Sequence, residues 1–220
     1  MTSPQPRLRV EDNVLETLKP MAFEVTLPKI LGELHLNEET RAFMTPSPEV
    51  PFPYLRDESI KKEVRDSLRV HGYKPTGRGK PASEYLIGAF EKEIFSPTQG
   101  INAAVDLCNL VSLHSGLPIS VVDRSLLGSE LSIKWLPKET RYPFNPSGQL
   151  IDASGLVALC DEDGVSGTPV KDSQRTKTNS ETVALVTVLW TPNSRVSTGE
   201  AVLNWYIERQ RLHGWSVERL

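Results

Sequence analysis

Cysteine, histidine and long apolar runs are all scarce in this sequence of 220 residues, and each scarcity excludes a class of protein. The two cysteines, Cys108 and Cys160, lie far apart among apolar residues, so we expect buried free thiols rather than a disulfide. The four histidines and two cysteines lack the spacing of metal ligands, and we expect no metal and no cofactor. No apolar run is long enough to cross a bilayer, and residues 1–16 contain no signal-peptide core. We therefore expect a cytoplasmic protein with no membrane partner.

Basic charge is also in short supply. The chain has 25 lysines and arginines against 28 aspartates and glutamates, which gives a formal net charge of −3. Proteins dedicated to binding duplex nucleic acid are usually basic, because neutralising phosphate dominates their affinity. The sequence therefore predicts no DNA binding and limits any contact with nucleic acid to a local cationic region.

The composition is that of a soluble globular protein, with 38% hydrophobic and 24% charged residues, and the length suits one domain with additional segments. Residues 1–56 are rich in proline and have weak periodicity. Four prolines between residues 45 and 55 exclude a helix or a central strand there. We predict an N-terminal extension over 1–56, draped over the surface or separable, and a domain over 57–220.

From residue 57 onward, the hydrophobic pattern predicts three helices followed by short strands. The helices are expected at 57–72, from Ser83 onward, and within 100–115, where apolar residues recur at helical spacing. Later the pattern changes to strands, with the sequences ISVVD, LSIKW and LVALC bounded by turn residues. TVALVTVLW is rich in β-branched residues and is typical of a strand buried on both faces. With an amphipathic helix over 197–214, this order predicts an α+β domain with a β core.

The segment GINAAVDLCNLVSLHSGLPISVVD, residues 100–123, predicts a helix that ends at a Gly-Pro turn and leads into a strand. Its helix carries polar residues among the apolar ones: Asn102, Asp106, Asn109, Ser112 and His114. Buried polar groups need hydrogen-bond partners. These residues therefore either tie the helix to its neighbours or face a pocket.

A first cation-rich segment, KPTGRGKPAS at residues 74–83, precedes a predicted helix. It has the glycines and the lysine of a phosphate-binding loop but not their spacing. It is either a flexible basic loop or a loop in which Lys74, Arg78 and Lys80 contact phosphate.

A second cation-rich segment, KDSQRTKTNSET at residues 171–182, precedes the most apolar strand. It mixes cations with hydroxyl and amide groups. It forms either a solvated turn or one side of a cleft, in which Lys171, Arg175 and Lys177 would meet an anionic ligand.

A series of short motifs follows the chain order of one known domain. The motifs are Ile101-Asn102, Val105-Asp106, Asn109, Gly116-x-Pro118 and Asp123. With the strands that follow, they make residues 72–192 resemble the B3/B4 domain of the bacterial phenylalanyl-tRNA synthetase β subunit. The chain resembles freestanding B3/B4-domain proteins still more closely, through Ser83-Glu84 and Asp172-Ser173. The resemblance implies a β-sandwich-like core flanked by helices, in three layers.

The resemblance also implies a pocket, in which the synthetase hydrolyses tyrosine wrongly attached to its tRNA. Candidate residues are Asn102, Asn109, Ser120 and Thr182 for the substrate pocket, and Arg175 and Lys177 for phosphate binding. No catalytic residue is assigned. A family histidine is replaced by Ser120, and the glutamate that reads the tyrosine hydroxyl aligns near Val186. This pocket is therefore expected to prefer a smaller or less polar side chain than tyrosine.

We accordingly expect an RNA-associated domain whose partner is tRNA or aminoacyl-tRNA. As an enzyme it would be a trans-editing deacylase, in which bound water hydrolyses the ester of a mischarged tRNA. We do not expect it to be a synthetase itself, since 220 residues are too few for the synthetase catalytic and anticodon-binding domains. The alternative is a non-catalytic module that binds an amino acid, another small ligand or a protein, and the acidic net charge favours that alternative.

Overall fold

The computed structural model describes residues 7–43, 57–92 and 100–220, and the proline-rich stretch 45–55 lies outside them. The helices are α1 (Asp12–Leu15), α2 (Glu38–Ala42), α3 (Glu58–Leu68), α4 (Ala82–Glu91), α5 (Ala103–Ser115) and α6 (Val196–Leu212). The strands are β1 (Arg7–Val10), β2 (Leu18–Thr26), β3 (Ile119–Asp123), β4 (Glu130–Trp135), β5 (Arg141–Pro143), β6 (Leu150–Asp152), β7 (Val157–Asp161), β8 (Gly164–Gly167), β9 (Ala184–Pro192) and β10 (Ser216–Arg219).

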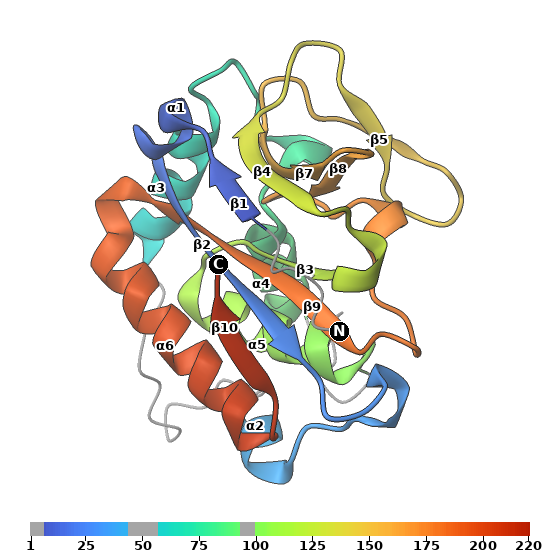
Figure 1. Ribbon diagram of the computed structural model, residues 1–220. Helices are drawn as coiled ribbons and strands as arrows, with labels where there is room; N and C mark the ends of the chain where they lie inside the picture. The colour runs from blue at the N-terminus through green and yellow to red at the C-terminus, as the bar shows by residue number, and fades with distance from the viewer. Residues whose placement is uncertain (1–6, 44–56, 93–99) are drawn as a thin grey trace.

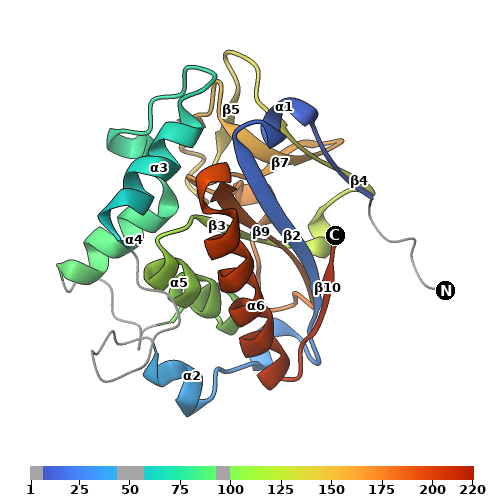
Figure 2. The ribbon, with the colours of Figure 1, turned by 90° about the vertical axis from the view of Figure 1, so that its left-hand side faces the viewer.

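The strands form two four-stranded sheets and a separate hairpin of β5 and β6. One sheet has the order β10-β2-β9-β3 and is antiparallel. The other has the order β1-β4-β7-β8, in which β1 and β4 are parallel and the other pairs antiparallel. Figures 1 and 2 show helices α3 to α6 on one side of the first sheet and the second sheet on its other side. The predicted α+β fold with a β core is confirmed.

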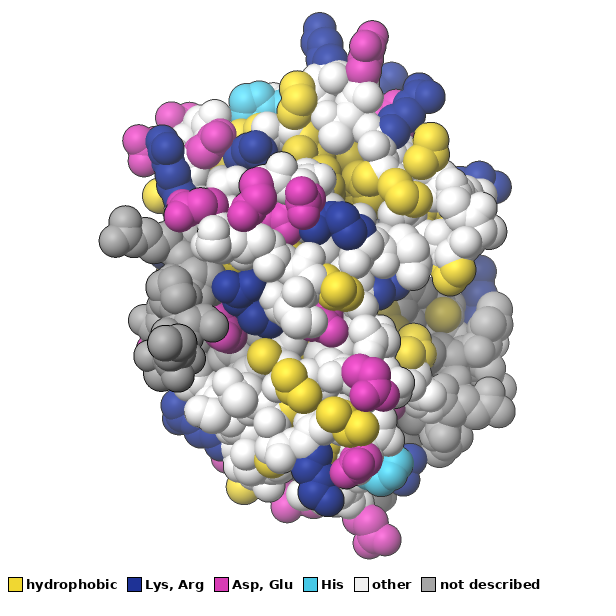
Figure 3. Space-filling model, turned by 45° about the vertical axis from the view of Figure 1, so that its right-hand side comes forward, with side chains coloured by type: hydrophobic (Ala, Val, Ile, Leu, Met, Phe, Trp, Pro, Cys, Tyr) yellow, Lys and Arg dark blue, Asp and Glu magenta, His cyan; other side chains and the backbone are white. Residues whose placement is uncertain are grey.

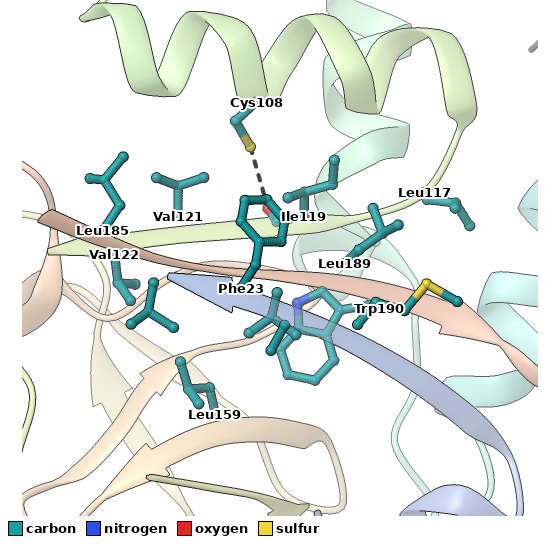
Figure 4. Packing of buried hydrophobic residues seen from close by; sticks show 14 of the residues in the cluster. Phe23, Cys108, Leu117, Ile119, Val121, Val122, Leu159, Leu185, Leu189 and Trp190 are labelled. Atoms are coloured by element: carbon teal, nitrogen blue, oxygen red, sulfur yellow. Dashed lines mark hydrogen bonds between the residues drawn. The ribbon is translucent and has the colours of Figure 1, made fainter. Parts of the chain in front are cut away.

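Strand β9 is an inner strand of the first sheet, because it pairs with β2 on one side and with β3 on the other. Every residue of β9 after Ala184 is buried. In Figure 4, Cys108 of α5 lies on one side of these strands and Leu159 of β7 lies on the other. The prediction that TVALVTVLW forms a strand buried on both faces is confirmed from Ala184 onward, whereas Thr182 and the exposed Val183 precede the strand.

The structure places residues 7–43 inside the fold, which corrects the predicted N-terminal extension over 1–56. β2 lies between β10 and β9 and pairs with β9 over nine residues. Phe23 of β2 is fully buried and packs edge-to-face on Tyr206 of α6, with 5.4 Å between ring centroids. The sequence signal is weak here because β2 is buried on both faces over most of its length, which removes the alternation of an exposed strand.

The polar residues of α5 mainly hold the helix in place. Asn102 is its N-cap, and the Asn102 side chain accepts a 3.0 Å hydrogen bond from the Val105 N–H. Ser112 donates to a carbonyl in the following turn at 2.8 Å, and His114 Nε2 donates to the Phe43 carbonyl at 2.7 Å. For these three residues the structure favours ties to neighbouring segments over a polar face lining one pocket.

Replacing Phe23 with alanine should lower the free energy of unfolding by about 3–5 kcal/mol, because it empties a closed site between β2 and α6. Chemical denaturation monitored by tryptophan fluorescence measures this loss. Leu15→Ala is the control, since Leu15 in α1 is 39% exposed and its loss should cost far less. Equal midpoints for the two variants would show that β2 is not an essential part of the core.

Candidate anion-binding site

A cavity of about 450 Å³ opens between the loop that follows α3, the β5–β6 hairpin and the start of the 171–182 segment. We call it the hairpin pocket; its side chains include Tyr73, Lys74, Arg78, Phe144, Asp152 and Lys171. The basic loop is held by two tyrosine hydroxyls. That of Tyr73 donates to the Gly79 carbonyl at 3.0 Å, and that of Tyr85 to the Gly77 carbonyl at 2.6 Å. The loop is therefore tied to the domain at two points.

Gly155, which follows the pocket residue Ser154, lies against the chain at His71. Its φ is +71°, and a Cβ atom at this position would lie 2.2 Å from the His71 carbonyl oxygen. Glycine alone adopts this φ readily and leaves room for so close an approach. Gly155 therefore lets the hairpin pack directly on the start of the basic loop.

Cations dominate the charge of the hairpin pocket. Lys74, Arg78 and Lys171 line it, and among the described residues no carboxylate lies within ion-pair distance of any of them. On the face shown in Figure 3, acidic and basic side chains are interspersed. A chain with net charge −3 thus holds, around one cavity, three cations that pair with no carboxylate of the described residues.

Lys171 has the most constrained amine of the three. Its Nζ lies 3.9 Å from the ring centroid of Phe144 and 5.7 Å from that of Tyr85. Burial lowers the pKa of the Lys171 amine, and the neighbouring charges of Arg78 and Lys177 lower it further. Lys177 itself donates to the Phe144 carbonyl at 2.7 Å and so anchors the aromatic wall.

The backbone that presents Lys171 is fixed by hydroxyl groups. The Lys171 carbonyl accepts hydrogen bonds from Thr168 Oγ1 at 2.9 Å and from the Tyr142 hydroxyl at 2.5 Å. Ser120 of β3 donates to the Thr168 carbonyl at 3.1 Å and accepts from Trp190 Nε1 of β9 at 3.0 Å. A chain of hydrogen bonds therefore runs from the core sheet to the pocket wall.

Asp172 binds the same turn to β3. Its two carboxylate oxygens accept hydrogen bonds from the backbone N–H groups of Val121 and Thr168, each at 3.3 Å. Burial raises the pKa of Asp172 to about 6, although the hydrogen bonds that it accepts oppose the rise. The carboxylate therefore faces β3 and does not neutralise Lys171.

The structure does not bring the six candidate residues of the sequence together in one cavity. Asn102 donates to Thr178 Oγ1 at 3.2 Å and lines a separate cavity beside Asp106. Asn109 is half-buried on α5. Thr182 is buried and donates to Asp123 at 2.5 Å.

The two candidate phosphate-binding cations differ in their surroundings. Arg175 donates to both carboxylate oxygens of Asp161, at 2.6 and 3.1 Å, and to Ser166 at 2.9 Å. Burial would raise the pKa of Asp161, but hydrogen bonds from Arg175 and the Gly128 N–H hold it below its usual value. Arg175 therefore forms an internal ion pair with Asp161, whereas Lys177 lies next to the hairpin pocket.

Sequence reasoning singled out Lys74, Arg78 and Lys171 but missed the hairpin residues Phe144 and Asp152. The tripeptide strands β5 and β6 are too short to give a periodic signal. The turn sequence NPSG between them, residues 145–148, was the one available indication of a hairpin.

Other expectations can be compared with the described residues directly. Both cysteines are buried free thiols, as predicted. Within the described ranges, no helix is long and apolar enough to span a membrane, and no group of three His, Cys, Asp or Glu side chains is placed to hold a metal ion.

Comparisons with known proteins give structural likenesses but no match in sequence. No protein-family model and no curated protein sequence matches the chain. The chain is similar to the crystal structure of an N-terminal fragment of the phenylalanyl-tRNA synthetase β subunit from Pyrococcus horikoshii, with a TM-score of 0.47 and 8% identity. The alignment covers 99% of this chain and 52% of that chain, so this chain spans about half the length of that fragment.

The raised pKa of Asp172 predicts a pH-dependent stability. The folded state has a pKa of about 6 at this group and the unfolded chain about 3.9, so the folded state binds more protons between these values. The free energy of unfolding should therefore fall as the pH rises from 4 to 6, by at most about 1.4 kcal/mol per pH unit from this group.

Urea denaturation of the wild type and Asp172→Asn across this range measures the effect. The variant should lose this part of the slope, whereas Asp163→Asn, at an exposed position, should keep it. Parallel stability curves for the wild type and Asp172→Asn would contradict the assignment.

Proposed function

We propose that the hairpin pocket binds the 3′-terminal nucleotide of a single-stranded RNA end, and that this RNA is a tRNA. The observation that carries the proposal is a cavity lined by Phe144 and by three cations that have no carboxylate partner within the described ranges. Single-stranded nucleic acids are bound by cations that contact phosphate and by aromatic rings that stack on bases. The cavity volume of about 450 Å³ falls in the range of small-ligand pockets.

The acidic net charge of the chain is compatible with this proposal. A terminal nucleotide needs only a few local phosphate contacts, whereas duplex binding needs an extended basic surface. The resemblance of residues 72–192 to the synthetase domain is the reason for choosing tRNA among RNAs.

The affinity for a 3′-CCA oligonucleotide should decrease in the double variant with Arg78→Gln and Lys171→Gln. For single strands each lost phosphate contact reduces the dependence of log affinity on log salt by about 0.7, so the slope should become shallower by about 1.4. Fluorescence anisotropy at several salt concentrations measures both quantities.

The matched control is the double variant Lys29→Gln with Lys62→Gln. The side chains of these two lysines are 65% and 79% exposed and lie outside the hairpin pocket. Both double variants remove two positive charges, so they change the net charge equally. Equal weakening in both double variants would show that net charge and not the pocket determines binding. If the oligonucleotide does not bind the wild type, the alternative of a non-catalytic module that binds a small ligand or a protein is favoured.

A hydrolytic activity is the second proposal, and Asp152 favours it. Among the described side chains that line the hairpin pocket, Asp152 is the one with a carboxylate. Hydrogen bonds from the Ser154 hydroxyl and N–H lower the pKa of Asp152. It is therefore ionised at neutral pH. It can accept a proton from a water that attacks the aminoacyl carbonyl, while the ribose oxygen leaves and takes up a proton.

Asp152→Asn should reduce deacylation of mischarged tRNA by about 10²-fold or more and leave the affinity for uncharged tRNA unchanged. Release of radiolabelled amino acid from a panel of mischarged tRNAs measures the rate. Asp163→Asn, at an exposed position outside the pocket, serves as the control. Hydrolysis that persists in Asp152→Asn would remove Asp152 from the reaction.

A further inference from the structure

The surroundings of Lys171 are unusual for a lysine at the wall of an accessible cavity. Most exposed lysines project into water or pair with a carboxylate, as Lys62 does with Asp66 at 2.9 Å. Lys171 is half-buried, and its amine is placed against the faces of Phe144 and Tyr85. The nearest acidic residue in sequence, Asp172, is turned toward β3 by the hydrogen bonds it accepts.

Two further observations concern reactivity. Arg78 and Lys177 add positive charge near the Lys171 amine, and both burial and these charges lower its pKa, so more of it is neutral than of an ordinary lysine. The backbone of Lys171 is fixed by Thr168 and Tyr142, which limits the positions that the amine can reach. A lysine that is desolvated and next to other cations is the usual form of a nucleophilic lysine in proteins.

We propose that Lys171 is a nucleophilic amine that forms an imine with a small phosphorylated aldehyde. The neutral amine attacks the aldehyde carbon, a proton moves from nitrogen to oxygen, and loss of water leaves the C=N bond, with no change in oxidation state. Lys74 and Arg78 line the same cavity and can hold the phosphate, and Phe144 supplies apolar surface beside the amine. This reactivity goes beyond RNA binding and does not depend on it.

The test uses pyridoxal 5′-phosphate as the probe and borohydride to reduce the imine to a stable secondary amine. With the full chain and limiting reagent, peptide mapping should find roughly tenfold more label on Lys171 than on Lys29 or Lys62, because these exposed lysines lack the cationic, desolvated setting. Lys171→Arg keeps the charge and should remove this label. Inorganic phosphate should compete with it.

A second comparison separates the amine from the phosphate contact. Arg78→Gln should slow labelling by pyridoxal 5′-phosphate roughly tenfold, because one charge-assisted contact is lost, and should slow labelling by unphosphorylated pyridoxal much less. Label distributed among lysines according to exposure, or unaffected by phosphate, would overturn the proposal. Mapping on the wild type decides the outcome even where a variant fails to fold.

Discussion

The pairing of β9 with a strand on each side, while both of its faces are covered, is the constraint on which the rest of the structure depends. A strand in this position can expose no polar group, so its neighbours must satisfy every backbone N–H and C=O. β2 pairs with β9 along its whole length and β3 pairs with Leu185–Leu189, while the helical layer and the second sheet cover the two faces (Figure 2). Trp190, which is fully buried in β9, reaches beyond the strand and donates to Ser120. In this way the core contacts the turn that presents Lys171.

Much of the fold could be predicted because its elements are amphipathic or continuously apolar. Asp57 caps the N-terminus of α3, as the acidic residues at this point in the sequence indicated, and the DEDG sequence lies at the β7–β8 turn. The placement of β2 could not be predicted, since pairing with β9 involves residues far apart in sequence. Ser120 was singled out from a motif, yet its role in holding the Thr168 carbonyl depends on a tertiary contact that no local pattern encodes.

The candidate site shows the same division. The cations Lys74, Arg78 and Lys171 could be found from sequence, because charges next to glycines and turns are visible in a single chain. The sequence alone could not show which of the cations lack a carboxylate partner. Arg175 has the same formal charge as Arg78, but Asp161 neutralises it across the β7–β8 region. Only the tertiary structure distinguishes a cation used for internal pairing from one available to a ligand.

The pairing of β2 with β9 also has a consequence for synthesis on the ribosome. About 160 residues lie between the two strands, so at typical elongation rates β2 has left the ribosome for roughly 10–30 seconds before β9 is complete. During that interval the apolar residues of β2 lack their native partner. An unpaired apolar strand is a template for wrong strand pairing. The nascent chain is therefore exposed to wrong strand pairing at β2 until translation reaches the last strands.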